Sequence, residues 1–446
     1  MQDLIVMATC VLAANAATAS STAFVNVNIV PMTSDTIVTQ QSVIVTDASI
    51  VAIGDVDTIP VPEDAWVVDG TDRYLMPGLT EMHAHVPEVG SQDLDRVMTL
   101  FVANGVTAIR GMLGRPSHLA LRQQLADGDA FGPRLITSGP SMNGESVSGV
   151  ADAMRKVRAQ HAAGYDFIKI HPGLSPDEFS VIAAVSTELG MRFAGHVPVA
   201  VGVDNALAAG IATIDHLDGY FVALLPANID PSGGYGGFFD VLLADQVIEE
   251  RIAGIAARTA AAGTWNVPTE SLFENRVSPL SVTDLRNRPE MRFMPEATVN
   301  RWVRSKETQE RERGFNADIA VRAIEIRRRL ILALHEAGAG LLLGSDAPQV
   351  FNVPGFSLHH ELEILVAAGL TPFEALQTGT AAAGKFLETN TGTVAIGRNA
   401  DLVLLDANPL EDIGNTRRIH GVMLRGSWYS SSDLEQRLSV YRRQDD

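Results

Sequence analysis

The chain has 446 residues, of which 46% are hydrophobic and 20% charged, values that are ordinary for a folded globular protein. Its 34 basic and 53 acidic side chains give a formal charge of −19, which would repel phosphate backbones and anionic membrane surfaces. Nucleic acid is therefore not an expected partner, and the single cysteine, Cys10, excludes an intrachain disulfide and a thiolate metal site.

Residues 1–20 contain an apolar, alanine-rich stretch. It ends in small-residue triplets that suit signal-peptidase cleavage, although the segment before it has Asp3 and no Lys or Arg. We expect a signal peptide over residues 1–20 and an exported protein. The alternative is a packed N-terminal strand in a cytoplasmic protein. No later run approaches the ~20 apolar residues of a membrane span.

Short alternating apolar runs follow up to Val68, divided by Asp, Gly and Pro, and they predict antiparallel strands. The same texture returns near the C-terminus, around residues 400–405 and 421–426. We therefore expect residues 21–76 and 388–446 to build one composite β-sandwich from both ends of the chain.

Residues 77–387 alternate strand-like and helix-like segments, as in βα units with a parallel sheet. The fold class predicted is α/β, a (β/α)8 TIM barrel, because there are eight candidate strands. These are residues 79–85, 106–112, 134–138, 166–171, 192–196, 212–216, 264–268 and 340–345. Helical stretches include residues 94–103, 150–163, 176–189 and 199–208. The last two connections are about fifty and about seventy residues long, a length typical of functional loops or inserts.

His83 and His85 end the first barrel strand. Because they alternate along it, both imidazoles face the same side and can bind one divalent ion such as Zn²⁺. Alone the pair is a weak signal, since a surface coincidence would look the same.

Lys169 lies in an apolar strand, where burial disfavours its charged form. A lowered pKa would let it capture CO₂ as a carbamate, an anionic group able to bridge two cations. A buried ion pair with a strand acid is the alternative.

Three further residues stand at strand ends: His196, His216 and Asp346. Each histidine alone could be structural, but their position on consecutive strands after Lys169 favours metal ligands. Asp346 can ligate a metal and accept a proton, whereas its structural alternative is a helix N-cap before Pro348.

These residues resemble the amidohydrolase superfamily in its two-metal form, and the resemblance includes the segment PGLTEMHAH at residues 77–85. It implies two divalent ions, with Zn²⁺ expected. His83 and His85 would hold the buried ion and His196 and His216 the outer one, with the Lys169 carbamate bridging both. Asp346 would bind the buried ion and act as the catalytic base for a hydroxide that bridges the metals.

Segments at residues 165–170 and 195–198 resemble the branch with imidazolonepropionase-like and prolidase-like proteins. Lys169 argues against the first activity, because those enzymes resemble one-metal hydrolases. Residues 139–144 lack the histidine with which the dipeptidases hold substrate, which weakens the second.

We therefore expect a hydrolase that cleaves an amide bond of a small molecule, such as a dipeptide or an N-acyl amino acid, ochratoxin-type amides included. A lactonase or esterase on the same metal site is one alternative, and a non-catalytic metal-binding protein is another. His171 and Tyr220 are candidate substrate contacts, with packing as the alternative role for each. Assembly into a homo-oligomer stays open.

Overall fold

Both ends of the chain contribute strands to one sheet. The computed structural model describes residues 21–229 and 236–443, so the signal peptide predicted over residues 1–20 lies outside the described residues. The strands of this sheet are β1 (Ser21–Ile29), β2 (Val38–Thr46), β3 (Ser49–Asp55), β4 (Trp66–Asp69), β5 (Tyr74–Pro77), β13 (Leu402–Leu405), β14 (Ile419–Leu424) and β15 (Ser427–Ser430). Their order is β15-β14-β13-β5-β1-β2-β3, with β4 paired to β1.

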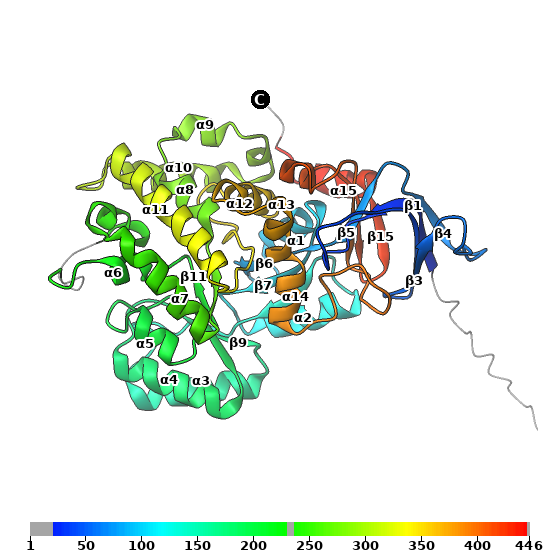
Figure 1. Cartoon of the computed structure of the whole chain (residues 1–446). Helices are drawn as coiled ribbons and strands as arrows, with labels where there is room; N and C mark the ends of the chain where they lie inside the picture. The colour runs from blue at the N-terminus through cyan, green and yellow to red at the C-terminus, as the bar shows by residue number, and fades with distance from the viewer. Residues whose placement is uncertain (1–20, 230–235, 444–446) are drawn as a thin grey trace, which may run out of the picture.

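The sheet folds over itself at β1. The first half of β1 pairs with β4 and its last two residues pair with β5, and the register against β2 shifts between Phe24 and Val27. Asn26, inside this shift, has a φ of 58°, and such a bulge bends a strand. Phe24, Val27 and Leu404 belong to the apolar cluster enclosed by the sheet. The predicted β-sandwich built from both termini is therefore confirmed, and it lies beside the barrel (Figure 1).

Two parallel sheets make the barrel. One contains β6 (Leu79–Ala84), β7 (Val106–Gly111) and β8 (Arg134–Thr137), and the other contains β9 (Phe167–Ile170), β10 (Arg192–Gly195), β11 (Thr213–Asp215) and β12 (Trp265–Val267). A bridge between Ser138 and Phe167 joins β8 to β9. On the other side, residues 340–345 close the ring, because Leu342 N donates to Asn266 O and Met82 N to Leu343 O. The predicted (β/α)8 barrel is confirmed.

The eighth segment differs from its prediction, since residues 340–345 contain one isolated bridge, from Leu341 to Asn266, and no regular strand. The buried carboxylate of Glu81 explains the difference. It accepts the N–H of Ser345 at 2.8 Å and that of His83 at 2.9 Å, so for these two N–H groups a side chain takes the place of a backbone acceptor. Burial raises the pKa of Glu81 to about 8.

Helices cover the barrel strands (Figure 1). The predicted stretches at residues 150–163 and 176–189 have the bounds of α3 and α4, whereas the stretch from residue 199 becomes helical only at Val203. The helices of the first six units are α1 (Gln92–Ala103), α2 (Ser117–Asp127), α3 (Val150–Ala163), α4 (Pro176–Leu189), α5 (Val203–Ala208) and α6 (Tyr220–Leu224). After the barrel segments come α12 (Phe356–Ala367), α13 (Pro372–Gly379), α14 (Ala381–Leu387), η5 (Ile413–Arg417) and α15 (Ser431–Ser439), the last of which packs against α1.

The two long connections carry structure of their own. Between β11 and β12 the described part contains, besides α6, the 3-10 helices η2 (Phe238–Gln246) and η3 (Glu249–Arg251) and then α7 (Ile252–Ala262). Between β12 and residue 340 come α8 (Glu270–Val277), α9 (Val282–Arg286), η4 (Pro289–Phe293), α10 (Glu296–Glu310) and α11 (Ala317–Glu336).

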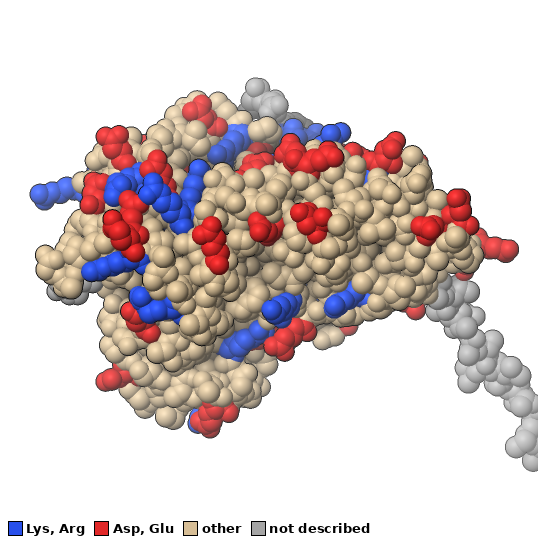
Figure 2. Space-filling view, viewed as in Figure 1, with Lys and Arg blue, Asp and Glu red and all other residues tan. Residues whose placement is uncertain are grey.

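The distribution of charged side chains and the apolarity of the helices can be compared with what the composition predicts. Acidic and basic side chains are intermixed on the face shown in Figure 2. Within residues 21–229 and 236–443, no helix combines the length and apolarity needed to cross a membrane.

Candidate metal centre

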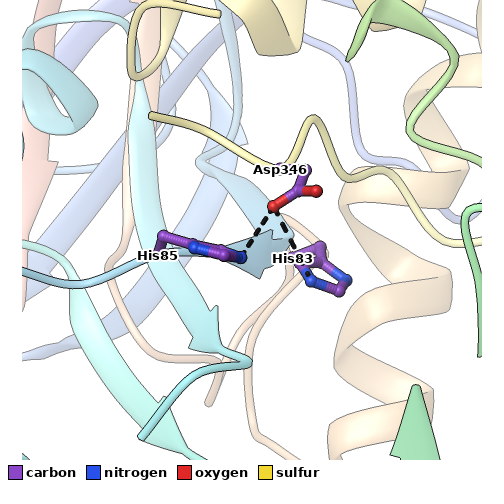
Figure 3. Close-up of side chains that lie close together, drawn as sticks. All are labelled: His83, His85 and Asp346. Atoms are coloured by element: carbon purple, nitrogen blue, oxygen red, sulfur yellow. Dashed lines mark ion pairs between the residues drawn. The ribbon is translucent and has the colours of Figure 1, made fainter. Parts of the chain in front are cut away.

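Two histidines and an aspartate meet at the C-terminal end of the barrel strands. His83 lies in β6, His85 follows it, and Asp346 follows the eighth segment. One ligand atom from each of the three lies within 4.8 Å of the others. Nε2 of His85 is 2.9 Å and Nε2 of His83 3.8 Å from Oδ1 of Asp346, so the three side chains point toward one another (Figure 3).

The donor set fits a divalent cation. Oδ1 of Asp346 is buried and has no hydrogen-bond partner among the described residues, although His85 lies close to it. Such an oxygen is costly to bury unless a cation or a donor satisfies it. Two imidazoles and a carboxylate are ligands that Zn²⁺ and similar ions accept.

His196 and His216 stand beside this cluster. They directly follow β10 and β11, their ring centroids are 4.6 Å apart, and the His216 ring is 4.4 Å from that of His83. The structure thus brings four histidines from the ends of three strands, β6, β10 and β11, to one place next to Asp346.

Two of these rings are held by a hydrogen bond at Nδ1, and in a third Nδ1 lies beside a carboxylate. Nδ1 of His196 is 3.0 Å from the Asp218 carboxylate, and Nδ1 of His216 is 2.8 Å from the Thr269 hydroxyl. Nδ1 of His83 is 2.9 Å from the Asp215 carboxylate, although the angle falls outside hydrogen-bond geometry. Metal-binding histidines use one nitrogen for the ion and the other for such an orienting partner. Nε2 is therefore the nitrogen that each ring can offer to a metal.

Lys169 lies in β9 and is fully buried, as its apolar strand indicated. Its Nζ is 3.3 Å from Nε2 of His83 and 3.7 Å from the Asp215 carboxylate. Burial lowers the pKa of Lys169 to about 8, which raises the neutral fraction of the amine at physiological pH. The amine therefore stands next to His83 of the cluster and is more nucleophilic than an exposed lysine.

Beneath the ligands lies a buried ion pair that the sequence analysis missed. Arg110, from β7, donates to the Asp215 carboxylate at 3.1 Å and to the Thr213 hydroxyl at 3.2 Å, and both charged side chains are fully buried. Burial raises the pKa of Asp215, but Arg110 and Lys169 outweigh that effect and hold it below its usual range. Asp215 thus stays anionic beneath His83 and Lys169. The sequence signal that could have indicated this pair is Arg110 itself, a charged residue in the predicted strand at residues 106–112.

A cavity of about 170 Å³ opens over the ligands. Its lining consists of His83, His85, His171, His196, His216, Phe238, Phe239, Leu272, Arg276, Asp346, Gln349 and Val350. Phe239, from the first long connection, lies parallel to the His216 ring at 4.9 Å. The long connections after β11 and β12 therefore shape the space in which a substrate would meet the metal ligands.

The two predicted substrate contacts have different positions. His171 lines the cavity, and its ring centroid is 4.8 Å from that of His196. Tyr220 does not reach the cavity. Its side chain is 0% exposed, and its hydroxyl donates to Oδ1 of Asn266 at 2.8 Å. A role for Tyr220 in substrate contact is therefore withdrawn in favour of packing, because a fully buried hydroxyl with a partner of its own is out of reach.

Comparisons with known proteins agree with this architecture. Residues 74–429 match the model of the Amidohydrolase family. A solved bottromycin amidohydrolase has a TM-score of 0.72 and 24% identity, over 94% of this chain and 90% of that one. A Xaa-Pro dipeptidase with bound methionine in its active site has a TM-score of 0.65 and 19% identity, over 92% of this chain and 100% of that one. Ochratoxinase from A. niger has a TM-score of 0.62 and 20% identity, over 92% of this chain and 96% of that one. At such low sequence identities, the structural likeness to these three proteins shows a shared fold only. The comparison with curated protein sequences found no match.

Proposed function

The chain belongs to the amidohydrolase family, and from that premise we propose that it hydrolyses an amide bond of a small molecule at a centre of two divalent metal ions. One observation carries the proposal. His83, His85 and Asp346 converge within 4.8 Å, and a buried, unsatisfied carboxylate oxygen faces the two imidazoles. A buried carboxylate oxygen without a hydrogen-bond partner destabilises the fold, and a bound cation would offset this cost.

The residues divide between two ions. His83, His85 and Asp346 would hold the first, and His196 and His216 the second. We propose that Lys169 carries a CO₂-derived carbamate that binds both, since its amine is the buried group next to Nε2 of His83. Zn²⁺ is the proposed ion, because imidazole and carboxylate ligands suit it.

When bound, divalent ions polarise the scissile carbonyl and lower the pKa of a coordinated water. Asp346 is placed to accept the proton of the attacking water, because its carboxylate ends the eighth segment at the floor of the cavity. The same carboxylate would return this proton to the leaving nitrogen. Asp215, which Arg110 holds in place, lies 2.9 Å from Nδ1 of His83 and would keep this imidazole in position during both steps.

The size of the cavity supports a small substrate. A space of about 170 Å³, closed in part by Phe238 and Phe239, suits the scissile group and one side chain of a dipeptide or an N-acyl amino acid. We propose ochratoxin-type amides as members of the same class, and His171 as a side chain that contacts the substrate.

Purified protein reconstituted with Zn²⁺ should hydrolyse at least one amide in a panel of N-acyl amino acids, dipeptides and lactones. A turnover of about 1 s⁻¹ or more is expected for a matched amide. Chelation should abolish the activity, and added Zn²⁺ should restore it. Turnover of lactones alone would assign an esterase to this site, and no turnover of any compound would favour a metal-binding protein without catalysis.

A further inference from the structure

One wall of the cavity is helix α8, which follows β12. Leu272 and Arg276 lie one turn apart on this helix, and both line the cavity. Arginine keeps its charge at all physiological pH values, whereas histidine titrates near neutrality. Among the described residues of the lining, Arg276 is therefore the one side chain with a permanent positive charge.

Helix α8 is fixed at both ends. At its N-terminus the buried carboxylate of Glu361 accepts the backbone N–H groups of the first two residues, at 2.9 and 2.6 Å. At its C-terminal end, Nζ of Lys306 donates to the carbonyl oxygen of Ser278 at 2.7 Å. Arg276 thus projects from a helix that is held in place. A residue that determines specificity needs such a rigid support.

The guanidinium of Arg276 is itself oriented by stacking. Its Cζ is 4.1 Å from the ring centroid of Phe238, and the Phe238 ring packs against Phe239 at 4.3 Å. Phe239 in turn lies on the His216 ring, so stacked groups lead from Arg276 to the metal ligands. Stacking uses the face of a guanidinium, while its five N–H donors lie in the plane. The group can therefore bind a ligand and keep its contacts within the chain.

We propose that Arg276 binds a carboxylate of the amide substrate and thereby selects anionic amides over neutral ones. The inference rests on the proposed function and deepens it by naming the substrate class and the residue that recognises it. A guanidinium and a carboxylate form two parallel charge-assisted hydrogen bonds, which fix orientation as well as affinity. The substrate class is then an N-acyl amino acid or a dipeptide with a free carboxylate, its scissile carbonyl toward Asp346 and its carboxylate toward α8.

The matched pair N-acetyl-L-phenylalanine and N-acetyl-L-phenylalanine amide tests the inference, with acetate release as the measurement. For the wild-type protein, kcat/KM should be about 10- to 100-fold higher for the carboxylate, the range expected for a hydrogen-bonded ion pair. Arg276→Met should remove most of this preference by raising KM, with little change in kcat. Arg276→Lys should restore part of it, and Arg258→Met, an exposed control on α7, should keep the wild-type preference.

An unchanged preference in Arg276→Met, or an equal loss of kcat on both compounds, would overturn the role of Arg276 in recognition. If the wild-type protein with its metals hydrolyses neither compound, ligand binding decides the inference, whereas the proposed function fails only if no amide of the whole panel is hydrolysed. N-acetyl-L-phenylalanine should then raise the Tm of the wild-type protein and leave that of Arg276→Met nearly unchanged. Equal shifts in the two proteins would contradict it.

Discussion

Replacement of Asp346 by asparagine is expected to lower kcat by about 10²- to 10⁴-fold, the usual contribution of a positioned acid or base. Asparagine keeps the size of the side chain and one oxygen toward His85, so part of the metal should remain bound. It cannot accept a proton from water, because the amide has no basic site near neutral pH. The expected result is a folded protein that binds metal and hardly turns over.

The measurements are steady-state kcat and metal content of the same preparation. Asp204→Asn is the matched control, since this aspartate is exposed on α5 and pairs with Arg258. It should leave kcat and metal content at the wild-type values. Turnover of Asp346→Asn within a few-fold of wild type would remove Asp346 as the base.

Lys169→Met should remove activity together with metal. Methionine fills the space of the buried lysine stem but cannot form a carbamate, so the two ions lose the anion proposed to bridge them. We expect metal content to fall from about two ions per chain to one or fewer, and kcat/KM to fall by about 10³-fold or more.

Bicarbonate provides an independent check on the wild-type protein. Reconstitution of the metal-free protein in CO₂-depleted buffer should recover less activity than reconstitution with bicarbonate. Lys385→Met, a variant of an exposed lysine in α14, should match the wild-type protein throughout. Full metal content and activity in Lys169→Met would leave Lys169 as an ordinary buried partner of Asp215.

The barrel and the cluster of His83, His85 and Asp346 could be predicted because they depend on local patterns. Alternation along one strand puts His83 and His85 on the same side, and the C-terminal ends of parallel strands meet at one end of a barrel. Lys169 could be singled out because a charged residue is rare in so apolar a strand.

The features that were missed depend on pairs far apart in the sequence. The sequence around Arg110 does not indicate that its partner is Asp215. The Glu81 carboxylate can act as a backbone acceptor would only because Ser345 lies opposite it. Tyr220 is close to His216 in sequence, yet α6 turns its hydroxyl toward Asn266 and away from the cavity. The position of Arg276 in the cavity lining likewise depends on where α8 lies, which the length of its connection did not indicate.

Metal analysis of the purified protein tests the two-metal centre most directly. We expect close to two divalent ions per chain after reconstitution in the presence of bicarbonate, and the loss of both on chelation. One ion per chain, or none, would contradict a bridged centre built from His83, His85, Lys169, His196, His216 and Asp346.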